Sequence, residues 1–262
     1  MSITSIEMLR RDEKEISNNV ISKIRSYDPN AQAIYLPNVD PNENVDYIFI
    51  TMEPSFGKWA RTEKNAKEMI NKGFRNFLWS KDDFIFHFSI YYFLSKNYYI
   101  TDISKVAVLT TTANETRGDV YQLWTKHLLR EIDIIGGKGS KIFYVGNIVE
   151  KYLKNEIRDK HMAGKIIHYS VNAGKKRKEA RKQDPDAYTK FFTEKKEIIS
   201  EEKIFEFAEN LLRDSIDNDN LINSILERLK KNTFLTESRK ELMFTYYLTF
   251  SAYYKANPNL LR

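Results

Sequence analysis

Three side chains suited to acid–base chemistry follow short runs of strand-forming residues. The side chains are Glu53, Asp102 and His168, and the runs before them cover residues 47–52, 98–101 and 165–167. Because the carboxyl ends of parallel strands meet at one edge of a sheet, where α/β proteins bind ligands, these side chains are expected to lie together. Two carboxylates and an imidazole at one edge favour a hydrolytic site. Each also has a structural reading, as a surface glutamate, a turn-capping aspartate and a hydrogen-bonded histidine.

Pro54 fixes where the first of these strands ends. Proline has no amide hydrogen to give to a sheet, and its ring biases the preceding residue, Glu53, away from helical backbone angles. The strand must therefore stop at this point, and the carboxylate of Glu53 is held on the turn that follows it.

The spacing of apolar residues predicts helices that alternate with the strands. The predicted strands cover residues 45–51, 98–103, 141–145 and 165–168. The predicted helices cover residues 4–26, 60–72, 84–94, 119–135 and 147–155, with a polar loop at 110–119 and a basic loop after 168. Such alternation predicts an α/β fold of three layers, α/β/α, around a short, mainly parallel four-stranded sheet.

From about residue 184 the pattern changes to helices alone. Residues 238–241 have the form of a capping box before an apolar helical stretch, and no convincing strand is present in this part of the sequence. We therefore expect an α/β domain with an N-terminal helix over residues 1–183, and a helical C-terminal extension over 184–262 that packs on it.

The composition excludes several classes of site. The chain has no cysteine, which rules out disulfides, thiolate zinc sites, cysteine-ligated iron–sulfur clusters and a cysteine nucleophile. The histidines His87, His127 and His161 lack the spacing of metal ligands, so no metal is expected. No apolar run reaches the ~18 residues of a membrane span, and residues 1–18 lack the apolar region of a signal peptide. A cytoplasmic protein without membrane partners is expected.

The charge balance points to a polyanionic partner. Lys and Arg outnumber Asp and Glu by 42 to 36, the net charge is +6, and the pI is about 9.1. From Lys160 to Lys182 the chain holds eight basic residues and one acidic residue, Glu179. Such a run is often only a solvated surface, but beside a strand-end site it favours contact with phosphates.

Four short motifs, in their order and spacing, resemble the uracil-DNA glycosylase superfamily. They are Met52-Glu53-Pro54, Ile100-Thr101-Asp102-Ile103-Ser104-Lys105, Ile142-Phe143-Tyr144-Val145-Gly146-Asn147 and His168-Tyr169-Ser170. The first resembles the motif in which an acidic or amide residue precedes proline, and the last resembles a His-Pro-Ser motif. The resemblance covers about residues 45–175. It implies hydrolysis of an N-glycosidic bond in DNA without a metal or cofactor.

The resemblance implies roles for the strand-end residues. Glu53 would position or activate the water that attacks C1′ of a flipped nucleotide. His168 would donate a hydrogen bond to the departing base, where negative charge develops in the transition state. Asp102 would face the Watson–Crick edge of the base, and Phe77 would stack on it.

The segment after His168 would hold the DNA backbone. Val171 lies near the position of the wedge residue of the family. The residues implied in DNA contacts are Ser170, Val171, Lys175, Lys176, Arg177 and Lys178. If they neutralise several phosphates, binding should weaken steeply with salt.

Departures from the family pattern bear on the substrate. Thr51 and Tyr169 replace a glycine and a proline. Asp102 replaces the asparagine of many uracil-specific members, and an ionised carboxylate, which only accepts hydrogen bonds, suits the amine of cytosine. Ser55, which with Met52 would line the base pocket, replaces a tyrosine that blocks C5 substituents. These changes imply a cytosine enlarged at C5, the substrate of an antiviral branch that removes glucosylated hydroxymethylcytosine from phage DNA.

Two alternatives to this assignment stay open. One is excision of uracil or another deaminated base in DNA repair. The other is a non-catalytic nucleic-acid-binding protein on the same fold. No lysine stands out as a Schiff-base nucleophile, so a glycosylase of this kind is expected to be monofunctional.

Overall fold

The computed structural model describes residues 4–41, 44–57, 59–136, 139–157, 161–169 and 174–258. Its strands are β1 (Ala33–Tyr35), β2 (Tyr47–Thr51), β3 (Tyr98–Asp102), β4 (Val106–Val108), β5 (Lys141–Val145) and β6 (Met162–Ile166). The main sheet has the order β3-β2-β5-β6, and β2 runs parallel to both of its neighbours. The predicted α/β class, the four-stranded sheet and the helical C-terminal region are confirmed.

The central strand β2 is apolar on both faces, which suits a strand that is covered on both sides. All five of its residues are buried. Phe49 stacks on Phe143 of β5, with ring centroids 5.2 Å apart. Ile48 and Ile50 alternate with Phe49 along the strand and belong to the hydrophobic core on the other face.

The register of β2 and β3 brings two acidic strand ends together. Thr51 lies opposite Asp102. The pairing continues past the strands, because the amide of Ser104 donates to the carbonyl oxygen of Met52 at 3.2 Å. Glu53 therefore leaves β2 beside the turn that follows β3.

The helices fall into two compact units. They are α1 (Ser5–Tyr27), α2 (Glu63–Asn71), α3 (Lys81–Phe93), α4 (Thr110–Gly136), α5 (Asn147–Leu153), α6 (Gly174–Gln183), α7 (Pro185–Glu194), α8 (Glu201–Ser215), α9 (Asp219–Lys230) and α10 (Glu237–Ala256). The first unit comprises residues 1–76 and 97–162, and the second comprises 77–96 and 163–262. Among the described helices, none combines the length and apolarity needed to cross a membrane.

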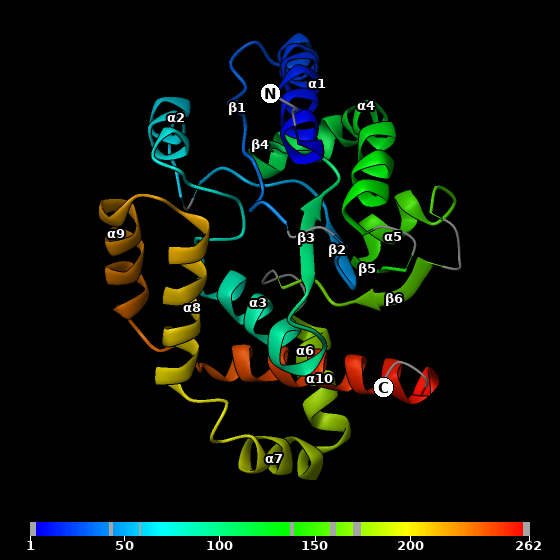
Figure 1. Ribbon diagram of the computed structural model, residues 1–262, viewed down its shortest axis with the longest axis vertical. Helices are drawn as coiled ribbons and strands as arrows, with labels where there is room; N and C mark the ends of the chain where they lie inside the picture. Colours follow the sequence, from blue (N-terminus) through cyan, green and yellow to red (C-terminus); the bar gives the residue numbers. More distant parts are fainter. Residues whose placement is uncertain are drawn as a thin grey trace. The chain divides into compact units, whose positions relative to one another are not determined.

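In the first unit, α1 and α4 lie side by side and cover the strands (Figure 1, blue and green). Helix α1 also contacts β1 and β4, while α4 contacts β2. Val20 and Ile24 of α1 are buried against a core that includes Trp124 and Leu128 of α4. This packing fixes the position of α4 relative to the carboxyl end of β2.

In the second unit, α3 packs against α8 and α10. Phe86 lies 5.4 Å from Tyr246, and Phe93 lies 5.9 Å from Tyr247, between ring centroids. The compact units therefore do not follow the predicted division after residue 183. The physical reason is that α3, which is buried along most of its length, is covered by the C-terminal helices α8 and α10.

The predicted polar loop over residues 110–119 is wrong, because these residues form the first turns of α4. Ala113, Thr116 and Val120 are buried at helical spacing. The residues between them are mostly exposed, so the stretch is polar without being a loop. The amide of Ala113 donates to the carbonyl oxygen of Leu109 at 2.9 Å, which closes the first turn.

Three further segments differ from expectation. Strand β4 was not predicted, and it pairs antiparallel with β1. Strand β6 ends at Ile166 and not at residue 168, so His168 lies two residues beyond the strand. The basic loop is wrong from residue 174 onward, where α6 begins. In this segment one buried residue lies among exposed charged residues, which is typical of a helix on a surface. The run of like charges does not by itself reveal this helix.

Candidate functional site

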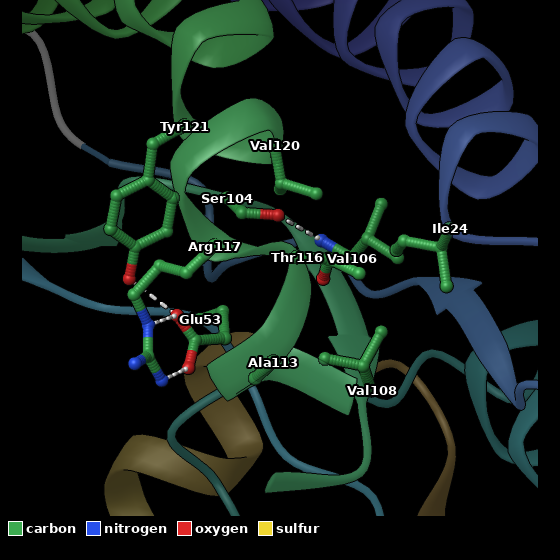
Figure 2. Close-up of a pocket in the computed structure, with 10 residues that line it drawn as sticks. All are labelled: Ile24, Glu53, Ser104, Val106, Val108, Ala113, Thr116, Arg117, Val120 and Tyr121. Atoms are coloured by element: carbon green, nitrogen blue, oxygen red, sulfur yellow. Dashed lines mark hydrogen bonds and ion pairs between the residues drawn. The ribbon is translucent and has the colours of Figure 1, made fainter. Parts of the chain in front are cut away.

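Two side chains of α4 hold the carboxylate of Glu53 (Figure 2). Arg117 donates to both oxygens, from Nη2 to Oε1 at 2.7 Å and from Nε to Oε2 at 3.2 Å. The hydroxyl of Tyr121 donates to Oε2. The side chains of Arg117 and Glu53 are 18% and 10% exposed, so the pair is largely shielded from solvent. A shielded bidentate pair fixes both the charge and the orientation of the carboxylate.

Helix α4 can present these two donors because they lie four residues apart on one face. Buried Trp124 and Leu128 continue the same face into the core of the first unit. The apolar residues therefore anchor the helix, and the polar pair projects toward the turn after β2. The hydrogen bonds to Glu53 raise the pKa of Arg117, which keeps the guanidinium charged.

A small cavity of about 10 Å³ lies beside Glu53, Arg117 and Tyr121 (Figure 2). Its other lining residues are Ile24, Ser104, Val106, Val108, Ala113, Thr116 and Val120. This volume is close to the least that admits one water molecule, and it is far too small for a nucleobase. Three donors occupy three of the roughly four acceptor positions on the carboxylate, so one position remains for a further donor.

Asp102 is buried beside this cluster, with 1% of its surface exposed. The hydroxyl of Thr51 donates to Oδ1, and the side-chain amide of Asn76 donates to Oδ2 at 2.5 Å. Burial, reinforced by the negative charge of Glu53, raises the pKa of the Asp102 carboxyl well above its ordinary value. A shift in this direction favours the protonated form of the carboxyl group.

This environment does not support the expectation of an ionised Asp102, because burial disfavours its charged form. A neutral carboxylic acid can both donate and accept a hydrogen bond. It does not distinguish the amine of cytosine from the carbonyl of uracil by charge alone. Contact of Asp102 with a base would also require one of its present hydrogen bonds, from Thr51 or Asn76, to break.

Lys105 closes the turn after Asp102 from inside the core. Its Nζ donates to the carbonyl oxygen of Asp102 at 2.6 Å and to Glu131 at 2.7 Å. Tyr99 and Thr101 donate to the other carboxylate oxygen of Glu131. The lysine that follows Asp102 by three residues is therefore a buried structural cation, and its amine is engaged and unavailable as a Schiff-base nucleophile.

A group of potential metal ligands lies next to this ion pair. Ligand atoms of Glu13, His127 and Glu131 lie within 4.8 Å of one another. Arg10 donates to both oxygens of Glu13, and Lys105 pairs with Glu131. Two cations already balance two carboxylates, so a divalent ion would have to displace Arg10 and Lys105. The arrangement is that of a buried ion-pair network.

His168 belongs to the second unit. Its ring stacks on Tyr169 with centroids 4.6 Å apart, and Tyr169 stacks on Phe86 at 5.5 Å. Burial, with a smaller contribution from the charge of Arg177, lowers the pKa of His168 to about 4. At neutral pH the ring is therefore uncharged, and one of its nitrogens carries a hydrogen that it can donate.

We expect His168 to stay neutral from neutral pH down to about pH 4. Because its folded-state pKa lies below the ordinary 6.5, its contribution to stability is complete above pH 6.5 and is lost as the pH falls toward 4. The measurement is an NMR titration of the histidine ring protons, with H168Q to assign the signal. A midpoint near 6.5 would show that the ring is not buried in solution.

Phe77, the predicted stacking residue, also lies in the second unit and is buried. Its φ is 64°, a left-handed backbone conformation that is uncommon for an aromatic residue. Such a conformation costs roughly 1–3 kcal/mol, which the surrounding packing must offset.

The basic residues of α6 differ in exposure. Lys175, Lys176 and Lys178 are exposed, as contact with phosphates requires. Arg177 is buried, and it donates to the carbonyl oxygen of Tyr169 and to Ser238 Oγ. Its predicted role in phosphate contact does not fit this placement, because the guanidinium faces the interior. Ser170 and Val171 lie outside the described residues.

Met52 and Ser55 flank Glu53 in the first unit. Met52 is partly buried against the core. Ser55 is exposed, its backbone forms a bridge with Val108, and its carbonyl oxygen accepts a hydrogen bond from the Trp59 indole at 2.9 Å. The small side chain therefore leaves the surface open at this position.

Sequence reasoning missed the residues that hold the two carboxyl groups. Arg117 and Tyr121 hold Glu53, and Asn76 holds Asp102. The sequence did contain a signal for Arg117 and Tyr121, because their four-residue spacing continues the helical pattern that includes Leu128. Asn76 precedes the aromatic stretch and carries no such signal.

Comparisons of the chain with protein-family models, curated proteins and solved structures find no match.

Proposed function

We propose that the protein is a monofunctional DNA glycosylase that hydrolyses the N-glycosidic bond of a flipped, modified base and leaves an abasic site. The supporting observation is the carboxylate of Glu53 at the carboxyl end of the central parallel strand. It is oriented by Arg117 and Tyr121, and it lies beside a second acid, Asp102. One acceptor position on Glu53 is left beside a cavity of water size.

The chemistry needs an oriented carboxylate more than a strong base. As the bond to the base breaks, its electrons leave with the base, and the sugar becomes a cation at C1′. An ionised Glu53 stabilises this positive charge and orients the water whose oxygen bonds to C1′. The proton lost by that water passes to Glu53. In this scheme neutral His168 donates a hydrogen bond to the departing base.

We place a cytosine derivative enlarged at C5 first among the substrates. The support is Ser55, whose exposed small side chain leaves room for a C5 substituent. The raised pKa of Asp102 weakens the argument for this choice from its charge. The exposed lysines of α6 supply the phosphate contacts that flipping requires, because extrusion of a base costs a few kcal/mol.

The test is direct incubation with duplex and single-stranded DNA carrying uracil, cytosine, hydroxymethylcytosine or glucosylated hydroxymethylcytosine. Abasic sites are detected by alkaline strand cleavage. We expect abasic sites with a modified cytosine. Abasic sites with uracil alone would favour base excision in repair. Salt-sensitive binding without any abasic site would favour a non-catalytic DNA-binding protein.

Asp102→Asn tests the protonation state of the second acid. An amide cannot ionise, and like a neutral carboxylic acid it offers one donor and one acceptor side. We therefore expect D102N to change the ratio of excision rates for cytosine and uracil substrates by less than about tenfold, or 1.4 kcal/mol. A larger shift toward uracil would mean that Asp102 loses its proton when DNA binds.

A further inference from the structure

The clamp formed by Arg117 and Tyr121 is more elaborate than a charge pair alone requires. A single cation would be enough to form an ion pair with Glu53. Here three hydrogen bonds, two from Arg117 and one from Tyr121, reach the two carboxylate oxygens from one helix. Three donors at fixed positions define the plane of the carboxylate, and with it the direction of the remaining acceptor position.

The side chain of Tyr121 is itself held in place by neighbouring residues. Its ring is buried and meets Tyr152 of α5 edge-on, with centroids 4.8 Å apart and an interplanar angle of 75°. Thr125 joins Tyr152 through a hydrogen bond of 3.3 Å between their hydroxyl groups. The donor that reaches Glu53 is thus held in one rotamer by packing, which is the arrangement that a preorganised site requires.

We infer that Arg117 and Tyr121 are positioning residues that orient Glu53 toward its attacking water. This inference depends on the proposed glycosylase function. Neither residue needs to touch the base or the sugar. Removing either should slow the chemical step and leave DNA binding unchanged, because a misplaced catalytic group lowers the rate more than the affinity.

A competing role for Arg117 is direct contact with a DNA phosphate, since arginine suits phosphate and carboxylate equally. Measurements of kcat and KM distinguish the two roles. A phosphate contact would raise KM and lower the salt dependence of binding when Arg117 is lost. A positioning role would lower kcat at constant KM.

The experiment compares R117Q, R117K and Y121F with the full-length wild type on the preferred substrate. We expect R117Q to lower kcat by about 10- to 100-fold with KM unchanged, R117K to recover part of this loss, and Y121F to lose about tenfold or less. R130Q is the matched control. Arg130 lies on the same helix, about 20 Å along it, in an exposed pair with Asp12, and its loss should leave kcat unchanged.

A second readout does not need activity. In 15N-edited NMR spectra, the Nε–H of Arg117 should give a resonance protected from solvent exchange that moves or disappears in E53Q, but not in the control E63Q. Glu63 pairs with Arg25 at the surface, where Nη2 of Arg25 donates to both carboxylate oxygens. An unprotected Nε–H would overturn the clamp whatever the kinetics show.

The outcomes are distinguishable. A protected Nε–H with unchanged kcat in R117Q would overturn the positioning role while the glycosylase proposal stands. Increased KM with constant kcat in R117Q would show instead that Arg117 contacts a DNA phosphate. A wild type that leaves no abasic sites on any substrate would overturn the proposed function and the inference together, even with the clamp intact.

Discussion

Replacing Glu53 by glutamine should lower the rate of base excision by about 10²- to 10⁴-fold, the usual contribution of a group that activates water. This corresponds to about 3–5 kcal/mol of transition-state stabilisation. The amide keeps the shape of the carboxylate but loses the charge that stabilises the sugar cation. DNA affinity should be retained, because the carboxylate of Glu53 is engaged by Arg117 and Tyr121, and we assign phosphate contact to other residues, the exposed lysines of α6. Single-turnover release of abasic sites measures the rate, and fluorescence anisotropy measures binding.

The variant also breaks an ion pair, so its fold needs a check. E53D serves as a comparison, because it keeps the negative charge but moves the carboxylate away from Arg117. Its excision rate should lie between those of the wild type and E53Q. E63Q removes a glutamate from the exposed pair with Arg25 and should leave excision unchanged. Full activity of a folded E53Q would contradict the assignment of Glu53.

Replacing Lys105 by methionine should reduce the free energy of unfolding by about 3–5 kcal/mol, the usual cost of leaving a buried charge without its partner. The side chains of Lys105 and Glu131 are 0% and 1% exposed. Methionine fills most of the space of the lysine stem but leaves Glu131 unpaired. It also removes the donor to the carbonyl oxygen of Asp102, so the turn beside the candidate site should loosen as well. Urea denaturation followed by circular dichroism measures the change.

Two comparisons isolate the buried pair. K23M removes a lysine of the first unit from an exposed pair with Asp119, and it should leave the free energy of unfolding almost unchanged. The double variant K105M/E131Q should be more stable than K105M, because it removes the unpaired charge and keeps an acceptor for Tyr99 and Thr101. A K105M variant as stable as K23M would mean that Lys105 is hydrated in solution.

The strands and the first strand end could be predicted because their signals are local. Pro54 ends β2 by its own backbone chemistry, and the apolar runs before Glu53 and Asp102 are continuous. The start of α4 could not be read in the same way. Its first turns carry polar residues on the exposed side, and the buried Ala113 and Thr116 are too small to mark an apolar face.

The environment of a side chain is harder to predict than its place in the chain. The raised pKa of Asp102 follows from burial by a fold that brings residues distant in sequence, among them Asn76, around it. The interior position of Arg177 within a run of lysines has the same origin, since its partner Ser238 follows it by 61 residues. Neither feature has a signal in the local sequence, because tertiary packing decides which residue of a charged run turns inward.

The placement of α3 has a consequence for synthesis of the chain. Residues 77–96 are made between β2 and β3, yet they pack with helices that begin only after residue 163. During translation β3 can join β2 as soon as both have emerged, whereas the intervening aromatic-rich helix is covered only after α8 and α10 have been made. The nascent chain therefore exposes this segment until its last helix leaves the ribosome, and exposed apolar surface of this kind favours aggregation.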